Sequence, residues 1–270
     1  MRQPRHTDLR VAIAGFGAIG QVVASHLLRG IPGLTLSAIG VRNASAATRA
    51  LPDSITVTDV ASLSDHADII VECAPAAVLP LIAAPALTAG RTLVVLSCGA
   101  LLDQMHLVDL ARAHGGRILV PTGALLGLDA VAAAAEGEIR SVRMITRKPP
   151  GGLRGAPYLE RHGIALDGLT RAVRVFEGTA REAARGFPAN LNVAVALSLA
   201  GIGPDRTRLE IWADPALTRN THTIEVDADS ARLSLTIENV PSENPRTGRI
   251  TALSVVALLR KMRGPLAVGT

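Results

Sequence analysis

The chain has few aromatic residues and few cysteines. Phe, Tyr and Trp make up 2% of its 270 residues, so Ala, Val, Leu and Ile have to build the core. This scarcity argues against binding of single-stranded nucleic acid, because such proteins stack bases on aromatic rings. The two cysteines, Cys73 and Cys98, are too few for a disulfide framework or a metal cluster. We therefore expect no metal, buried unreactive thiols and a reducing cytoplasm.

The chain also lacks a stretch typical of export or of a membrane span. No apolar run precedes Val11, so no secretory signal is expected. Residues 73–90 are uncharged, but prolines interrupt them and much of their apolar content is alanine. We interpret this segment as a loop and short helices on a sheet. The net charge of +5 attracts anionic small molecules, and neither a nucleic acid nor a membrane is an expected partner.

What the chain does have is a glycine-rich turn after its first apolar run. Residues 11–20 read VAIAGFGAIG and continue as the helical pattern QVVASHLLRG. A strand, a G-x-G-x-x-G turn and a helix start in this order are typical of a dinucleotide-binding unit. The alternative is a purely structural turn in another α/β protein.

Each glycine of this turn has a physical role in such a unit. Gly15 permits the sharp turn, and Gly17 lets a pyrophosphate lie against bare backbone. Gly20 lets the helix pack closely on the strand. The helix begins near Ala18 and Ile19, so its free N–H groups and the positive end of its dipole face the phosphates.

Strand-like and helix-like segments alternate up to residue 123. Fully apolar strands alternating with helices predict a parallel sheet covered on both faces, so we expect a Rossmann-type dinucleotide-binding domain over residues 1–123. The expected strands are 10–14, 34–39, 55–57, 68–72, 92–97 and 117–120, and the expected helices are 19–29, 76–89 and 103–114.

Beyond residue 123 the pattern changes to apolar/polar alternation, clearest in 221–227 and 231–238. Period-two alternation predicts a mainly antiparallel sheet, so we expect an α+β substrate and catalytic domain over residues 124–240. The C-terminal segment 241–270 is expected to pack back on the first domain. Further strands are expected at 139–147, 171–177 and 207–213, and helices at 126–136, 179–200 and 247–262.

The end of the second expected strand bears on the choice of dinucleotide. NAD-selective sites place a carboxylate there, on the ribose hydroxyls. Residues 36–45 read LSAIGVRNAS and contain no carboxylate. Arg42 stands where a guanidinium can pair with a 2′-phosphate, which indicates that NADP is accepted. The alternative is a solvated loop cation, so the cofactor is expected to be NAD or NADP.

Three further positions are candidates for chemistry. His222 lies at the start of an alternating strand; on an open sheet face it would titrate near neutral pH and could move protons. Lys148 ends a strand before a mobile loop and could grip carboxylates, or belong to a charged turn. Asn190 lies in a helix-forming run, where asparagine is unfavourable, so it has either a polar role or a helix-capping role.

Taken together, these segments resemble the L-aspartate dehydrogenase family. The resemblance spans nearly the whole chain, and the stretches near residues 176–201 and 220–226 are its most specific parts. The matching segments are GFGAIG (15–20), VECA (71–74), SCGAL (97–101), PTGALLGLDA (121–130), RKP (147–149), FEGTAREAARGFPANLNVAVALSLAG (176–201), ADP (213–215), NTHTIEV (220–226) and ENPRTGRITALSVVALLR (243–260).

The resemblance implies a Rossmann domain, an α+β domain whose sheet faces the nicotinamide, and a homodimer. It also implies that His222 is the active-site histidine. Ala124 and Asn190 match positions that contact the dinucleotide near its nicotinamide end. The implied reaction is oxidation of L-aspartate by NAD or NADP to iminoaspartate, which water converts to oxaloacetate and ammonia. The imine could feed NAD biosynthesis, or the reverse reaction could make aspartate.

Two other functions stay open at this point. One is an NADPH-dependent imine reductase of the dihydrodipicolinate reductase kind, which shares the architecture. The other is a catalytically silent dinucleotide-binding sensor, which would bind NAD or NADP without any aspartate-dependent turnover.

Overall fold

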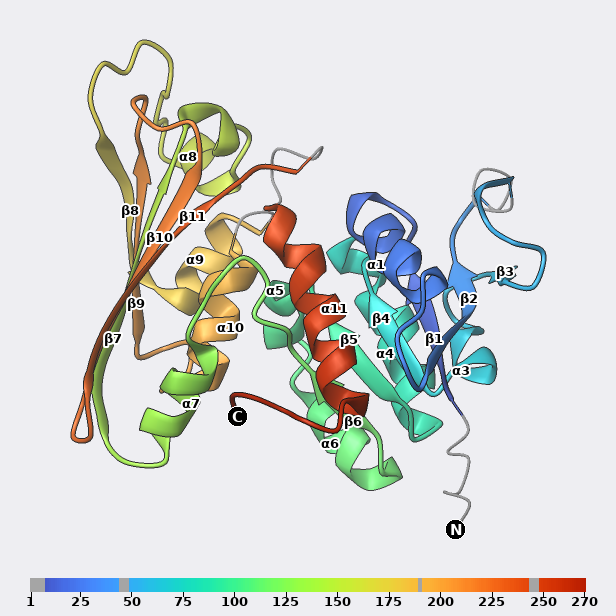
Figure 1. Cartoon of the computed structure of the whole chain (residues 1–270). Coiled ribbons are helices and arrows are strands. Elements are labelled where there is room, and N and C mark those ends of the chain that lie inside the picture. The colour runs from blue at the N-terminus through green and yellow to red at the C-terminus, as the bar shows by residue number, and fades with distance from the viewer. Residues whose placement is uncertain (1–7, 44–48, 189–190, 243–247) are drawn as a thin grey trace. The chain divides into compact units, whose positions relative to one another are not determined.

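The computed structural model describes residues 8–43, 49–188, 191–242 and 248–270. It consists of two compact units (Figure 1). Unit 1 comprises residues 1–121 and 252–268, and unit 2 comprises residues 122–251 and 269–270. Each unit has its own sheet and its own hydrophobic core, and each is described separately below.

Unit 1 is built on a six-stranded sheet, here called sheet A, with strand order β3-β2-β1-β4-β5-β6. All five of its strand pairs are parallel, which confirms the predicted Rossmann-type sheet. Its strand β4 is buried from end to end and β1 and β5 are buried over their carboxyl-terminal parts, as expected for a sheet covered on both faces. The strands are β1 (Leu9–Ala14), β2 (Leu34–Gly40), β3 (Thr56–Thr58), β4 (Ile69–Glu72), β5 (Thr92–Val95) and β6 (Arg117–Leu119).

The helices of unit 1 pack apolar side chains against this sheet. Helix α11 (Arg249–Arg263), at the far end of the chain, contributes Val255, Val256 and Leu259 to the same buried cluster as Val11 and Ile13 of β1. The other helices are α1 (Ala18–Leu28), α3 (Leu63–His66), η1 (Ala76–Val78), α4 (Leu79–Thr88), α5 (Cys98–Leu102) and α6 (His106–His114). The short helices α3 and α5 were not expected from the sequence.

Unit 2 is built on a five-stranded sheet, here called sheet B, with strand order β11-β10-β7-β9-β8. Strands β7 and β9 are parallel, and the other three pairs are antiparallel. The expected mainly antiparallel sheet is confirmed, with this one parallel pair as an addition. The strands are β7 (Ile139–Lys148), β8 (Val173–Thr179), β9 (Thr207–Ala213), β10 (Asn220–Ala228) and β11 (Arg232–Asn239).

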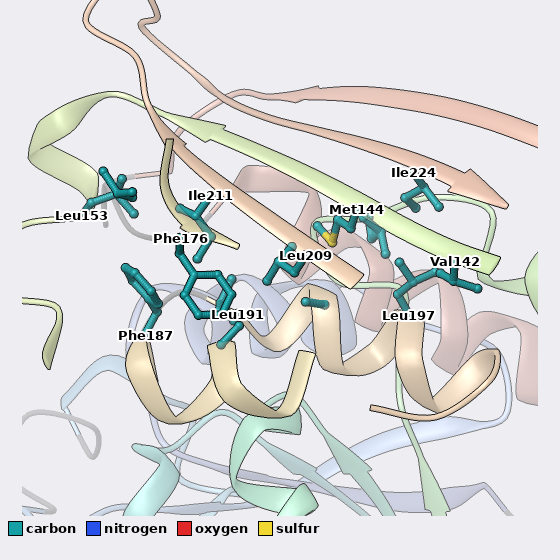
Figure 2. Close-up of a cluster of buried hydrophobic side chains, with 14 of the residues drawn as sticks. Val142, Met144, Leu153, Phe176, Phe187, Leu191, Leu197, Leu209, Ile211 and Ile224 are labelled. Carbon is teal, nitrogen blue, oxygen red and sulfur yellow. The ribbon is translucent and has the colours of Figure 1, made fainter. Parts of the chain in front are cut away.

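One face of sheet B, here called its inner face, packs on helices. Figure 2 shows Val142 and Met144 of β7 and Leu209 of β9 on the side of the sheet where Leu197 and its helix lie, and Ile211 of β9 beside Phe176. Three of the five aromatic residues, Tyr158, Phe176 and Phe187, belong to this core, and the rings of Phe176 and Phe187 meet edge to face with centroids 5.6 Å apart. The helices of unit 2 are α7 (Leu128–Ala135), η2 (Pro150–Gly152), α8 (Pro157–Arg161), α9 (Ala180–Gly186) and α10 (Asn192–Ala200).

The prediction of one long helix over residues 179–200 is wrong, because two helices stand there. Thr179 begins α9 with a capping box, in which its hydroxyl accepts from the backbone N–H of Glu182. Pro188 then prevents continuation, since its ring clashes with the preceding turn and forces the residue before it out of the helical region. Phe187 accordingly has φ −137° and ψ 54°.

Candidate functional site

The glycine turn at the end of β1 has the geometry that its sequence predicts. Gly15 has φ +99°, and a Cβ there would lie 2.7 Å from the carbonyl oxygen of Cys73. A Cβ on Gly20 would collide with the carbonyl oxygen of Gly15. By contrast, a Cβ on Gly17 would meet nothing within 4 Å. The backbone at Gly17, just before Ala18 and Ile19 open α1, is therefore open to a diphosphate.

The loop beside this turn is held by a buried carboxylate that sequence reasoning missed. Glu72, the last residue of β4, has no exposed surface. It accepts hydrogen bonds from the backbone N–H groups of Ala74, Leu96 and Ser97 and from the Ser97 hydroxyl, at 2.9–3.1 Å. Burial raises the pKa of this carboxyl, and the four donors oppose that rise.

Glu72 therefore joins the loops after β4 and β5 at the carboxyl edge of sheet A. The loop after β4 includes Cys73, whose carbonyl packs against Gly15. The sequence did contain a signal for this role, since Glu72 is the one acidic residue in the apolar strand IIVE. A carboxylate buried in a core needs several hydrogen-bond donors.

Arg42 lies two residues beyond the end of β2 and is exposed. This places it at the carboxyl edge of sheet A, where ligands of open α/β sheets bind. Exposure fits both a ribose-phosphate contact and a solvated loop cation, so its assignment stays a prediction.

His222 lies on the inner face of sheet B and is only 3% exposed. It is in β10, directly opposite Thr146 of β7, and its Nδ1 is 3.1 Å from the Thr146 hydroxyl. Our expectation of an open face and titration near neutral pH is wrong. Burial, together with the positive charge of nearby Lys148, lowers the pKa of the imidazole to about 3.

Lys148 closes β7, two residues after Thr146 and therefore on the same face. It is 3% exposed, so it is a buried lysine and not part of a charged turn. Burial lowers the pKa of its ammonium group to about 8. In the segment after it, residues Pro150–Gly152 form the 3-10 helix η2.

Ala124 lies just before α7, and its carbonyl oxygen accepts a hydrogen bond of 3.0 Å from Asn239 Nδ2. Asn190 lies outside the described residues. Its two expected roles therefore stay predictions, and the structure gives Leu191 as the N-cap residue of α10. Asn239 was not singled out from the sequence, because one asparagine at a strand end carries no local signal.

The inner face of sheet B thus brings an imidazole, a hydroxyl and an ammonium group together at one end of an apolar surface. A neutral imidazole there can accept a proton, and an ammonium group can bind a carboxylate. Within the described residues, no three His, Cys, Asp or Glu side chains are placed to hold a metal ion. Cys73 and Cys98 are free, and burial raises the pKa of the Cys98 thiol to about 12.

Comparison with known proteins places the chain in a family. Its residues 129–262 match the C-terminal domain family of aspartate dehydrogenase, and residues 15–121 match the NAD-binding domain family of homoserine dehydrogenase. It is 59% identical to the L-aspartate dehydrogenase of Bradyrhizobium diazoefficiens, over 99% of this chain and 96% of the relative. The chain belongs to the L-aspartate dehydrogenase family. This confirms the resemblance, and with it an oxidoreductase that uses NAD or NADP.

Other relatives agree with this assignment. The chain is 58% identical to L-aspartate dehydrogenase 3 of Bordetella bronchiseptica, over 97% of this chain and 98% of that one. The solved structure of the Thermotoga maritima aspartate dehydrogenase matches 97% of this chain and 99% of its own, with a TM-score of 0.75. At 23% identity that match supports the fold alone. In the part of the chain that the structure describes, no helix is long and apolar enough to span a membrane.

The glycine turn gives a first prediction. Gly15→Ala strains a backbone with φ +99° and pushes a methyl group into the Cys73 carbonyl, so the loop must shift. Strain of this kind costs about 1–3 kcal/mol, and we expect the dissociation constant for the reduced dinucleotide to rise about tenfold or more, measured by fluorescence titration.

The matched control for this prediction is Gly30→Ala. Gly30 has φ +100°, but a Cβ there meets nothing within 4 Å. This variant carries the backbone strain without the contact at the turn, so its dinucleotide affinity should equal that of the wild type. Wild-type affinity in Gly15→Ala would contradict a binding role for the turn.

Proposed function

We propose that this protein is an NAD- or NADP-dependent L-aspartate dehydrogenase. It oxidises L-aspartate at Cα to iminoaspartate, and water then converts the imine to oxaloacetate and ammonia. The observation that carries the proposal is the 59% identity, over nearly the whole of both chains, to a relative with this activity in its name. The test is aspartate-dependent formation of reduced dinucleotide, followed by absorbance. A chain that binds the dinucleotide but reduces none with aspartate would overturn the proposal.

The dinucleotide site is assigned to residues of the glycine turn. Gly15, Gly17 and Gly20, with Ala18 and Ile19 at the start of α1, would hold the pyrophosphate. The open backbone at Gly17 supports this, because a helix N-terminus offers free N–H groups to phosphate oxygens. Ala124 and Asn190 are proposed to contact the nicotinamide end. When bound, the nicotinamide ring accepts the hydride from Cα of aspartate.

Arg42 is proposed to bind the 2′-phosphate of NADP, because it is exposed at the carboxyl edge of sheet A and no carboxylate is present in residues 36–45. We expect Arg42→Gln to weaken NADPH binding about 10- to 100-fold and to leave NADH binding unchanged, since a charge-assisted hydrogen bond contributes about 1.5–3 kcal/mol. Both affinities are measured by titration. The matched control is Arg112→Gln, on the exposed surface of α6. Equal effects on both dinucleotides would remove this assignment.

His222 is proposed as the general base that activates the water attacking the imine. This role needs a free lone pair on Nε2, so Nδ1 carries the hydrogen and donates it to the Thr146 hydroxyl, 3.1 Å away. Burial and the charge of Lys148 keep the imidazole neutral in the free protein. A substrate carboxylate beside Lys148 would offset that charge and raise the pKa of His222, making it a better base when substrate is bound.

The corresponding prediction concerns turnover. We expect His222→Asn to lower kcat about 10²- to 10⁴-fold at saturating dinucleotide, because a positioned general base contributes that much to rate. The measurement is steady-state kinetics with aspartate. His162→Asn is the matched control, since His162 stacks on Tyr158 in the same unit and has no proposed role. Near-wild-type kcat in the His222 variant would end the proposal.

Lys148 is proposed to hold a substrate carboxylate from its buried position at the end of β7. Its ammonium group is charged below about pH 8 and loses its proton above, so KM for aspartate should rise as pH increases through 8. Lys148→Met should raise KM about 10- to 100-fold at neutral pH and abolish this rise. Steady-state kinetics across the pH range provides the measurement.

The control for Lys148 is its neighbour Arg147. Arg147 points to the other face of β7, where it lies over the Trp212 ring and 3.5 Å from Asp214. Arg147→Met should therefore keep the wild-type KM and its pH dependence. If both variants behaved alike, the general positive field and not Lys148 would explain aspartate binding.

We further propose that the enzyme works as a homodimer in the cytoplasm. The dimer is what the family resemblance implies. The cytoplasm is supported by Cys73 and Cys98, which are both free, the state that a reducing compartment maintains.

A further inference from the structure

Asn239 is a buried side chain with an unusual hydrogen-bond balance. It is the last residue of β11 and is 3% exposed. Its Nδ2 donates to the carbonyl oxygen of Ala124, 115 residues earlier in the chain, at 3.0 Å. Its Oδ1 is buried and has no hydrogen-bond partner among the described residues. Gly248 closes over this oxygen, since a Cβ on Gly248 would lie 2.9 Å from Oδ1.

The orientation of this amide follows from its surroundings. A flipped amide would place Oδ1 against the Ala124 carbonyl oxygen, and two acceptors repel each other. The observed orientation keeps the bond to Ala124 and leaves Oδ1 unpaired. Buried polar atoms in proteins nearly always have a partner. An apolar residue would lose the bond to Ala124 but would also avoid this unpaired acceptor, and the two effects oppose each other. The net stability that an asparagine adds at this position is therefore small.

The register of sheet B places Asn239 on the inner face, which also carries His222. Asn239 is opposite Asn220, and His222 is opposite Ile237, so Asn239 lies on the same face as His222, one pair further along. The amide therefore fastens the segment that carries Ala124 to the end of the sheet that carries His222.

We propose that Asn239 is a positioning residue for the nicotinamide end of the dinucleotide. By donating to the Ala124 carbonyl it holds the Ala124 backbone at a fixed place relative to His222. The inference rests on the proposed function, which assigns Ala124 to the dinucleotide site. It adds a residue that does not itself touch the ligand but determines where a contacting residue lies.

Asn239→Asp gives the sharpest test, because only a protonated carboxyl group can donate to the Ala124 carbonyl. The side chain lies against the Ala124 carbonyl and the Gly248 backbone, neither of which titrates. The titratable groups near it in sheet B are Glu238, the preceding residue of β11, and His222 and Lys148 on the same face. The wild type has all three, so comparing the variant with the wild type at each pH removes their contribution.

Because the position is buried, the pKa of the new carboxyl should be raised above its ordinary value, so the carboxyl is protonated at pH 5 and ionised at pH 8. We expect the variant to bind reduced dinucleotide like the wild type near pH 5 and about three- to tenfold more weakly than the wild type at pH 8, which is the loss of one neutral hydrogen bond.

Ser234→Asp is the matched control. It adds the same charge to the same strand on the exposed face, and its affinity relative to the wild type should not change with pH. Asn239→Leu removes the donor and the unpaired acceptor together. The lost bond to Ala124 and the removed unpaired acceptor have opposite effects on stability, so the thermal unfolding midpoint, followed by the fluorescence of Trp212, should change little. The variant should nevertheless bind the dinucleotide about three- to tenfold more weakly at every pH.

The possible failures are distinguishable. A wild-type protein that binds no dinucleotide would overturn the proposed function. If the wild type binds and both Asn239 variants match it at all pH values, the positioning role of Asn239 is overturned. If Asn239→Leu binds the dinucleotide more weakly and also unfolds at a lower temperature, the positioning role is likewise overturned. The weaker binding would then be explained by a structural role of the residue.

Discussion

Thr146, Lys148 and His222 occupy one end of the buried face of sheet B, and the chemistry proposed for this protein depends on their burial. Farther along the same strands, Met144 and Ile224 fill that face with apolar side chains. Removal from water disfavours charge, so the imidazole is held neutral and the ammonium group is brought close to neutral titration. Exposed residues of the same types would keep ordinary pKa values. Solvent would also screen them, so a bound carboxylate would change their pKa values less.

Unit 1 uses a buried polar group differently. Glu72 is surrounded by four donors from two loops, and these bonds fix the loop against which Gly15 packs. A buried carboxylate with all its donors in place rigidifies its surroundings, whereas an unpaired one would be costly. Asn239 in unit 2 differs, because its amide nitrogen donates one hydrogen bond while its buried oxygen has no partner among the described residues. The two side chains share one effect, which is to hold a backbone segment in place.

Local patterns predicted the fold well, because each pattern reflects one physical rule. Apolar runs marked the strands of sheet A, and period-two alternation marked β10 and β11. The prediction of a single helix over residues 179–200 was wrong. The helical spacing of apolar residues continues through this segment, but Pro188 interrupts the backbone hydrogen bonds of a helix. For the site, alternation assigned His222 to a face of its strand, but not to a buried one. The burial of Lys148 was not visible, because its neighbours in sequence are a charged arginine and two prolines.

By itself, the sequence determined the glycine turn, the parallel and antiparallel character of the two sheets, and the family. These depend on residue types a few positions apart, which the chain encodes locally. Only the tertiary structure decided which strands lie beside one another. The pairing of β7 with β10 brings Thr146 to His222 across 76 residues of sequence, and the end of β11 brings Asn239 to Ala124. Such pairs, and the desolvation that sets their protonation, arise from packing of distant segments, which no local period records.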